Sequence, residues 1–119
     1  MNERKAAMKL RTKSFASAII RFYISFDKSK EENHVLGRQM LRSGTSVAAN
    51  YREASRARSD ADFISKIEIC AQEADETQLW LELLLDDCGA NPEHTQPIWK
   101  EADELIAIFT TMAKNTKNR

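Results

Sequence analysis

Apolar residues recur at helical spacing in four separate segments of the chain. The first segment carries two adjoining apolar stripes, formed by Phe15, Ile19, Phe22 and Phe26 and by Ala16, Ile20, Tyr23 and Ile24. Two stripes cover more of a helix than one core face requires. The pattern therefore predicts a helix over residues 8–27 and predicts that part of its surface packs against another copy of the chain.

The second segment, residues 30–57, is preceded by a serine, Ser29, that is followed three positions later by Glu32. This spacing is that of a capping box, in which each side chain accepts a hydrogen bond from a backbone N–H. Gly37 and Gly44 lie two turns apart on one flank, and glycine in a helix costs about 1 kcal/mol relative to alanine. We therefore expect a neighbouring backbone to approach this flank closely. The inward-facing residues are Leu36, Met40, Val47, Tyr51 and Ala54.

The third segment, residues 60–88, has the most regular pattern. Ser59 and Asp62 give it a second start signal, and Gly89 follows it as a C-cap. Apolar and small residues alternate at spacings of four and three, which is the seam of a left-handed bundle. The seam residues are Phe63, Ile67, Cys70, Ala74, Thr77, Leu81, Leu84 and Cys88.

The fourth segment, residues 96–114, follows a short Asn-Pro turn. Thr95 can cap this helix, and Pro97 can occupy its first turn, where a missing N–H leaves no hydrogen bond unmade. We expect the lysine- and asparagine-rich end from Lys114 to Arg119 to fray. The seam residues are Ile98, Ala102, Leu105, Phe109 and Met112.

Four such segments with short connections predict an all-α fold. Each connection of a few residues forces a helix to run antiparallel to the one before it, which gives an up-down-up-down four-helix bundle. The 119 residues include only three glycines and two prolines, and the length fits a single domain over residues 1–119. No apolar run approaches the roughly 18 residues that a membrane span needs, so we expect a cytoplasmic protein with no membrane partner.

The net charge of zero conceals a division of charge along the chain. Residues 1–60 hold thirteen Lys/Arg against six Asp/Glu, and residues 61–119 hold five against twelve, so the halves carry +7 and −7. On the second predicted helix, arginines form a basic line that could bind phosphates through planar, charge-assisted hydrogen bonds. The line consists of Arg38, Arg42, Arg52 and Arg56 with Thr45 and Ala49, and Lys9, Arg11, Lys13 and Arg58 could extend it.

Ion pairing within the protein is the alternative explanation of the basic line. The third predicted helix carries a comparable acidic line of Glu68, Gln72, Asp75, Glu82 and Asp86, with Glu73 and Glu76 nearby. Acidic and basic residues can therefore face one another inside the bundle or between subunits. No aromatic residue is interleaved with the arginines, which argues against recognition of single strands by stacking.

Residues that could support catalysis or bind a metal are few and do not form a site. Glu31 and His34 have the Glu-x-x-His spacing of di-iron bundles, but this motif occurs once, and His94 lies in a predicted connection. The hydroxyls of Ser43, Thr45 and Ser46 have no histidine partner, so we interpret these residues as small side chains at a tight helix crossing. Cys70 and Cys88 lie about 27 Å apart on one helix, too far for a disulfide, and are expected to be core residues. We expect no metal, no cofactor and no enzymatic activity.

Two tryptophans are interpreted as core or interface anchors. Trp80 and Leu83 lie off the main seam of the third helix, so they extend the apolar surface beyond one bundle. This favours self-association. The expected oligomer interface consists of Ile20, Tyr23, Ile24, Trp80 and Leu83.

Residues 41–85 resemble the signature of the four-helix-bundle family of 23S ribosomal RNA intervening-sequence proteins. They read LRSGTSVAANYREASRARSDADFISKIEICAQEADETQLWLELLL, and the core of the match is RSGTSVAAN, EA, DFI, EADET and WLELL. The signature residues, to which we assign structural roles, are Arg42, Ser43, Gly44, Thr45, Ser46, Asn50, Glu53, Glu73, Glu76 and Trp80. Among them, Arg42 and Glu53 are expected to form ion pairs between helices.

The resemblance implies an assembly and possible partners. It implies a closed homopentameric ring, related in shape to the accessory protein of diversity-generating retroelements, which binds nucleic acid and a reverse transcriptase. No enzymatic activity comes with the family. We therefore expect a non-catalytic oligomer that binds structured RNA or DNA as an accessory to the element encoding it. The alternative is a protein-interaction scaffold that does not bind nucleic acid.

Overall fold

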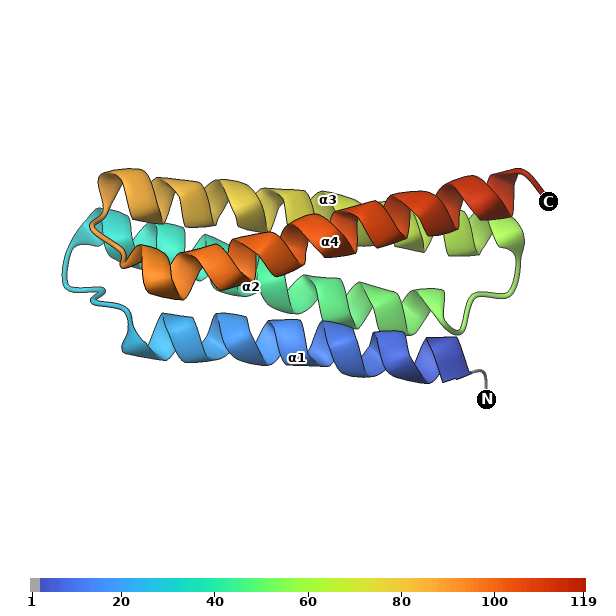
Figure 1. Ribbon diagram of the computed structural model, residues 1–119, viewed down its shortest axis with the longest axis horizontal. Coiled ribbons are helices and arrows are strands. Elements are labelled where there is room, and N and C mark those ends of the chain that lie inside the picture. Colours follow the sequence, from blue (N-terminus) through green and yellow to red (C-terminus); the bar gives the residue numbers. More distant parts are fainter. Residues whose placement is uncertain (1–2) are drawn as a thin grey trace.

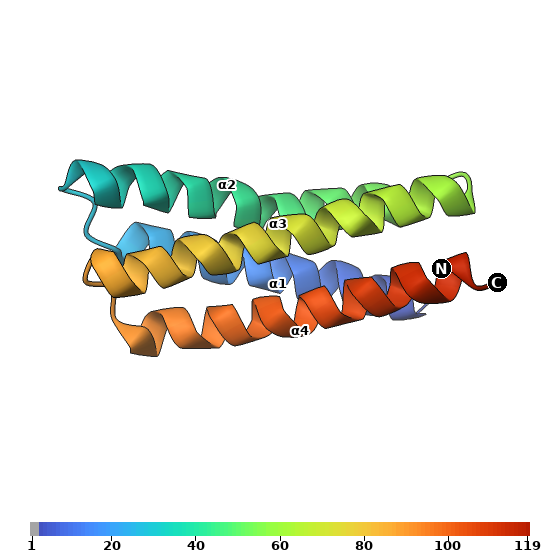
Figure 2. The same ribbon diagram turned by 90° about the horizontal axis from the view of Figure 1, so that it is seen from above.

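Four helices make up the computed structural model, which describes residues 3–119 of the chain (Figure 1). They are α1 (Glu3–Ser25), α2 (Glu31–Ala54), α3 (Asp60–Asp87) and α4 (Pro92–Lys117). Consecutive helices lie side by side and run in opposite directions, as Figures 1 and 2 show. Helix α1 also neighbours α4, although this contact is the sparsest of the four. The predicted all-helical, four-helix fold is confirmed, and no strand occurs in residues 3–119.

Both terminal helices are longer than predicted. Helix α1 begins at Glu3 rather than at residue 8, because residues 3–7 are good helix formers and Met8 continues its buried face. Helix α4 extends to Lys117, beyond the expected fraying point. Among residues 3–119, none of the four helices has a stretch with the length and hydrophobicity that a membrane span requires.

The predicted start of the fourth helix is wrong by one turn. Asn91 is the cap, since its Oδ1 accepts a hydrogen bond from the Glu93 N–H at 2.9 Å, and Pro92 occupies the first helical position. The Thr95 N–H already donates to the Asn91 carbonyl at 3.1 Å, so Thr95 is inside the helix and does not cap it. Pro97 therefore also lies inside α4 rather than in its first turn.

Of the two predicted serine caps, one is correct. Ser59 Oγ accepts a hydrogen bond from the Asp62 N–H at 3.1 Å and caps α3. Ser29 does not cap α2, because its own N–H donates to Asp27 Oδ1 at 3.0 Å and the helix begins after Lys30, which makes no side-chain cap. Gly89 ends α3 as predicted, with a φ of 73° that favours glycine.

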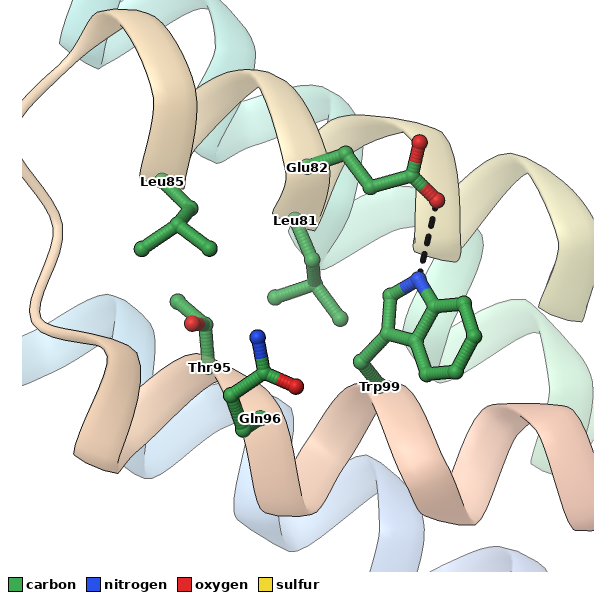
Figure 3. Close-up of a pocket in the computed structure, with 6 residues that line it drawn as sticks. All are labelled: Leu81, Glu82, Leu85, Thr95, Gln96 and Trp99. Carbon is green, nitrogen blue, oxygen red and sulfur yellow. Dashed lines mark hydrogen bonds between the residues drawn. The ribbon is translucent and has the colours of Figure 1, made fainter.

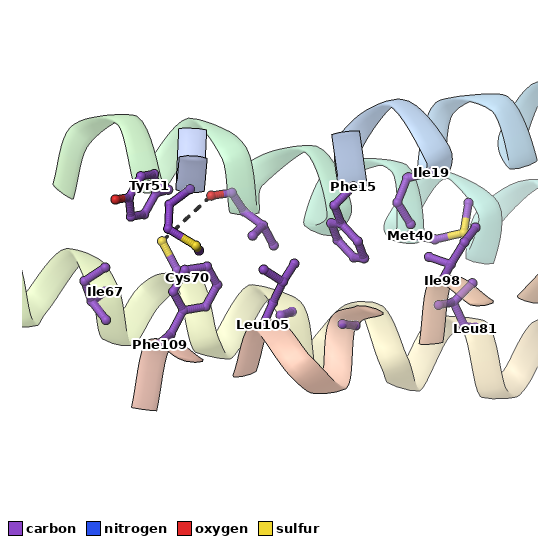
Figure 4. Packing of buried hydrophobic residues seen from close by; sticks show 14 of the residues in the cluster. Phe15, Ile19, Met40, Tyr51, Ile67, Cys70, Leu81, Ile98, Leu105 and Phe109 are labelled. Carbon is purple, nitrogen blue, oxygen red and sulfur yellow. Dashed lines mark hydrogen bonds between the residues drawn. The ribbon is translucent and has the colours of Figure 1, made fainter. Parts of the chain in front are cut away.

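The predicted seams meet in one core that all four helices share. Figure 4 shows this packing, in which Tyr51 of α2 stacks on Phe109 of α4 with ring centroids 6.3 Å apart. Most seam residues are buried. The half-buried exceptions lie towards the helix ends or the core margin and are Phe26, Leu36, Phe63, Cys88 and Met112.

The crossing of α1 and α2 is close at the two glycines of α2. A Cβ added at Gly44 would lie 2.7 Å from Ile19 Cγ1, and one at Gly37 would lie 3.4 Å from the Tyr23 ring. The expected close approach is present, but the approaching atoms belong to side chains of α1 rather than to a backbone. The branched Ile19 side chain therefore fits against α2 only because residue 44 has no side chain.

Small hydroxyl residues of the signature hold α2 and α3 together. Ser43 Oγ and Thr77 Oγ1, both fully buried, are 2.7 Å apart, and Thr77 also donates to the Glu73 carbonyl at 2.8 Å. Thr45 Oγ1 donates to the Leu41 carbonyl at 2.8 Å. The bond between Ser43 and Thr77 joins the two helices and satisfies buried hydroxyls, so it accounts for Ser43 as a structural residue, whereas the bond of the half-buried Thr45 lies within α2.

Candidate nucleic-acid interface

Three arginines on the outer side of the α2 segment point to solvent. Arg38 and Arg52 of α2 and Arg56 in the following turn are exposed, whereas Met40 and Val47 on the opposite side of α2 are buried. We call these three residues the α2 arginine trio. None of them forms an ion pair with any residue between 3 and 119. Their guanidinium groups are therefore available to an external anion.

Arg42 lies on the same predicted line but reaches α3. Its Nη1 is 3.1 Å from Glu73 Oε2, and its Nη2 is 3.6 Å from Glu76 Oε2. Lys66 of α3 pairs with Glu53 of α2 at 3.0 Å. The ion pairs expected for Arg42 and Glu53 are thus present, and ion pairing explains Arg42 but not the trio.

The two carboxylates around Arg42 share a single cation. The pKa of Glu76 is raised, mainly by a hydrogen bond with Glu73, then by loss of hydration and by the Glu73 charge, while Arg42 opposes the rise. Ionised Glu76 is therefore less favourable in the folded chain than in the unfolded one at neutral pH. Arg42 is committed to this acidic pair and is a poor candidate for binding phosphate.

The cations of α1 divide between two flanks of that helix. Lys13 is exposed and Lys9 is half-buried, and neither forms an ion pair within residues 3–119. Arg11 instead faces α4, where its Nε and Nη2 donate to the two Glu101 carboxylate oxygens, each at 2.8 Å. Glu104 lies 3.7 Å from the same guanidinium. Arg11 therefore bridges the sparse α1–α4 contact and does not extend the basic line.

The acidic line of α3 does not face the arginine trio. Glu68 pairs with Lys117 of α4 at 2.9 Å, and Glu82 accepts a hydrogen bond from Trp99 Nε1, also at 2.9 Å. The other members, Gln72, Asp75 and Asp86, are exposed. Since α1 and α2 lie within the basic half of the sequence and α3 and α4 within the acidic half, the two halves become two different sides of the bundle.

A pocket of about 210 Å³ lies between α3 and α4 (Figure 3). Its lining is mainly apolar, and the carboxylate of Glu82 is already bound by the Trp99 indole. The Thr95 hydroxyl is buried and makes no hydrogen bond with the part of the chain that the structure describes. The lining residues are Leu81, Glu82, Leu85, Thr95, Gln96 and Trp99, and they include no nucleophile with an adjacent base.

Candidate metal ligands are not brought together. Within residues 3–119, no group of three His, Cys, Asp or Glu side chains is placed to hold a metal ion. Both cysteines are free; Cys70 is fully buried, and burial raises its pKa to about 12. A thiol with this pKa is almost wholly protonated near pH 7 and is a poor nucleophile.

The structure adds cations that were not predicted as part of the interface. Arg4, Lys5 and Arg119 lie at the same end of the bundle as Arg58. They were not predicted because a first helix beginning at residue 8 and a frayed C-terminus place them outside the bundle. The clusters of charged residues near both ends of the sequence are the feature that could have indicated these additional cations.

The fold makes this chain a small four-helix-bundle protein. Residues 4–111 match the model of the family described as 23S rRNA-intervening sequence protein, and the chain belongs to that family. It is also similar to the crystal structure of a protein with unknown function from the S23 ribosomal protein family of Bacteroides thetaiotaomicron. The TM-score is 0.82 at 36% sequence identity, over 92% of this chain and 97% of that chain. No curated protein matches the chain.

Proposed function

We propose that this chain is a non-catalytic, homo-oligomeric bundle that binds structured RNA or DNA through the outer face of α2. The observation that carries the proposal is the α2 arginine trio, which is exposed and has no acidic partner among the described residues. Guanidinium groups bind phosphate oxygens in planar, charge-assisted pairs, and the release of counterions favours such contacts. The trio also belongs to the half of the chain that carries +7.

The spacing of the trio favours a duplex over a single strand. Arg38 and Arg52 are separated by fourteen residues, or about 21 Å of helix. This exceeds the width of a major groove, about 12 Å, so the two side chains can contact phosphates on both sides of one groove. Tyr51, which lies between Arg38 and Arg52 in the sequence, is buried in the core and offers no exposed ring, whereas single-strand binding commonly depends on stacking against aromatic rings.

Neutralising the trio tests the proposal. The variant Arg38→Gln/Arg52→Gln/Arg56→Gln is expected to bind a duplex RNA about tenfold more weakly at low salt, with a shallower salt dependence, because fewer counterions are released. The matched control is Arg21→Gln/Lys100→Gln/Lys114→Gln, which removes three exposed cations elsewhere and is expected to retain the affinity. Equal affinities of the two variants, or wild-type binding that does not respond to salt, would count against the proposal.

We also propose that the chain assembles as a closed homopentamer. Ile20 and Ile24 of α1 are 40% and 71% exposed, and Trp80 and Leu83 of α3 are half-buried. Helices α1 and α3 are not neighbours in the bundle. Two apolar patches on separate helices suit a head-to-tail contact, in which unlike surfaces of successive copies meet and close a ring.

The stoichiometry is directly measurable. Light scattering is expected to give five times the mass of one chain at every concentration above the dissociation constant of the ring. Ile24→Ser is expected to lower the mass without loss of helix content, because it makes an exposed apolar contact polar. A compact monomer at high protein concentration would rule out the ring.

A protein-interaction scaffold in the cytoplasm is the second candidate function. The exposed Leu10 of α1, which is 66% accessible and is not assigned to the contact between copies, favours contact with protein rather than with phosphates. A reverse transcriptase is one proposed partner. Retention of such a protein by a chain that does not bind RNA at low salt would favour the scaffold.

A further inference from the structure

Both described chain ends and the α2–α3 connection meet at one end of the bundle, as Figures 1 and 2 show. A pocket of about 640 Å³ lies there. Its charged lining residues come from three parts of the chain: Arg4 and Lys5 from α1, Arg58 from the connection with Asp60 at the start of α3, and Arg119 beyond α4. We call this the end pocket.

The cations of the end pocket outnumber its acid by four to one. Asp60 is the acid, and its Oδ1 accepts a hydrogen bond from Arg119 Nη2 at 2.7 Å. Lys5 Nζ donates to the Ser55 carbonyl at 3.3 Å. Arg58 is exposed and forms no ion pair with a described residue. Lys5 and Arg58 therefore have no carboxylate partner within residues 3–119, so their positive charge remains in the pocket.

Stabilisation of helix ends accounts for only some of the cations in the end pocket. Lys5 bonds a carbonyl at the C-terminal end of α2, where a cation is favourable. Arg58 lies in the connection and forms no hydrogen bond or ion pair within residues 3–119. Stabilisation of helix ends thus explains Lys5 but does not explain Arg58.

The end pocket differs from the arginine trio in how it arranges charge. The trio presents single cations along a line, which suits the single negative charges of successive phosphodiesters. The end pocket gathers several cations around one space, which suits a phosphate monoester carrying close to two negative charges at pH 7. Its volume is in the range of small-ligand pockets and is too small for a duplex.

We infer that the end pocket binds the terminal phosphate of a nucleic-acid strand whose backbone lies along the α2 arginine trio. Arg56, the last residue of the trio, is two residues from Arg58 in the sequence, so the trio ends beside the connection that lines the pocket. The inference rests on the proposed nucleic-acid binding and adds a preference for phosphorylated ends.

The test uses one RNA hairpin prepared with a 5′-phosphate, with a 3′-phosphate, or with hydroxyls at both ends. Wild-type protein is expected to bind one phosphorylated form about fivefold more tightly than the hydroxyl form, as one added charged contact implies. Lys5→Gln/Arg58→Gln is expected to abolish this preference. Arg21→Gln/Lys100→Gln, which removes the same charge elsewhere, is expected to keep it.

A gain-of-function variant separates ligand binding from structural support. Asp60→Asn removes the opposing charge and releases Arg119, so it is expected to increase the preference for the phosphorylated end. An unchanged or smaller preference would contradict the inference. Equal wild-type affinity for all three hairpins would overturn the end pocket alone, whereas absence of binding to every hairpin at low salt would overturn the proposed function as well.

Discussion

Phe109→Ala is expected to lower the free energy of unfolding by about 3–5 kcal/mol, the usual cost of truncating a buried phenylalanine. Phe109 is fully buried and stacks on Tyr51 of α2, so the substitution leaves a cavity between α4 and α2. Domains of this kind have a total stability of about 5–15 kcal/mol. The loss is therefore a large fraction of the total.

Urea-induced unfolding followed by circular dichroism measures this loss. The comparison is made at one protein concentration, because an oligomer's stability depends on the concentration of its subunits. Phe26→Ala is the matched control, since Phe26 lies just after α1 and is only half-buried; its expected loss is smaller, about 1–2 kcal/mol. Equal losses for the two variants would contradict the burial of Phe109 in the shared core.

Gly44→Ala is expected to destabilise the protein by about 1–3 kcal/mol, although alanine is the better helix former. The new methyl group would lie 2.7 Å from Ile19 Cγ1 and 3.0 Å from Cγ2. These atoms lie at the branch of a fully buried side chain, so they cannot move aside without displacing α1. Overpacking therefore outweighs the gain in helix propensity.

Gly37→Ala provides the contrast on the same flank of α2. Its methyl group would lie 3.4 Å from the Tyr23 ring, close to ordinary van der Waals contact, so a gain of up to about 1 kcal/mol is expected. Combining Gly44→Ala with Ile19→Ala should remove the clash, which a double-mutant cycle detects as a favourable coupling energy. If Gly44→Ala alone raises the midpoint of thermal unfolding, α1 packs less closely than the structure indicates.

The buried seams of the four helices were predictable because apolar residues recur at helical spacing along the sequence. Competition between neighbouring side chains for the same capping role was harder to predict. Ser29 has the spacing of a capping box, yet the Asp27 carboxylate takes its N–H, and Asn91 caps α4 before Thr95 can. In each case two nearby side chains suit the same role, and the geometry of the preceding turn decides between them.

The candidate interface was only partly predictable for a different reason. Arg38 and Arg42 lie on one predicted line, but only Arg42 is within reach of Glu73 on α3. Helical spacing gives the direction of a side chain relative to its own helix, not the register of the neighbouring helix. Lys5 and Arg119 lie over 100 residues apart in the sequence, and only the antiparallel course of the helices seen in Figure 1 brings them to one pocket.

The separation of charge between the two sides of the bundle governs how the molecule meets a polyanion. With no net charge, the protein has no long-range attraction as a whole and acts as an electric dipole across its short dimensions of 22 and 20 Å. At physiological ionic strength the Debye length is about 8 Å, less than half of that thickness. A duplex lying against α2 is therefore screened from the carboxylates on the far side, while one that approaches α3 and α4 is repelled. Under the proposed function, the orientation of the duplex is thus selected before any specific contact forms.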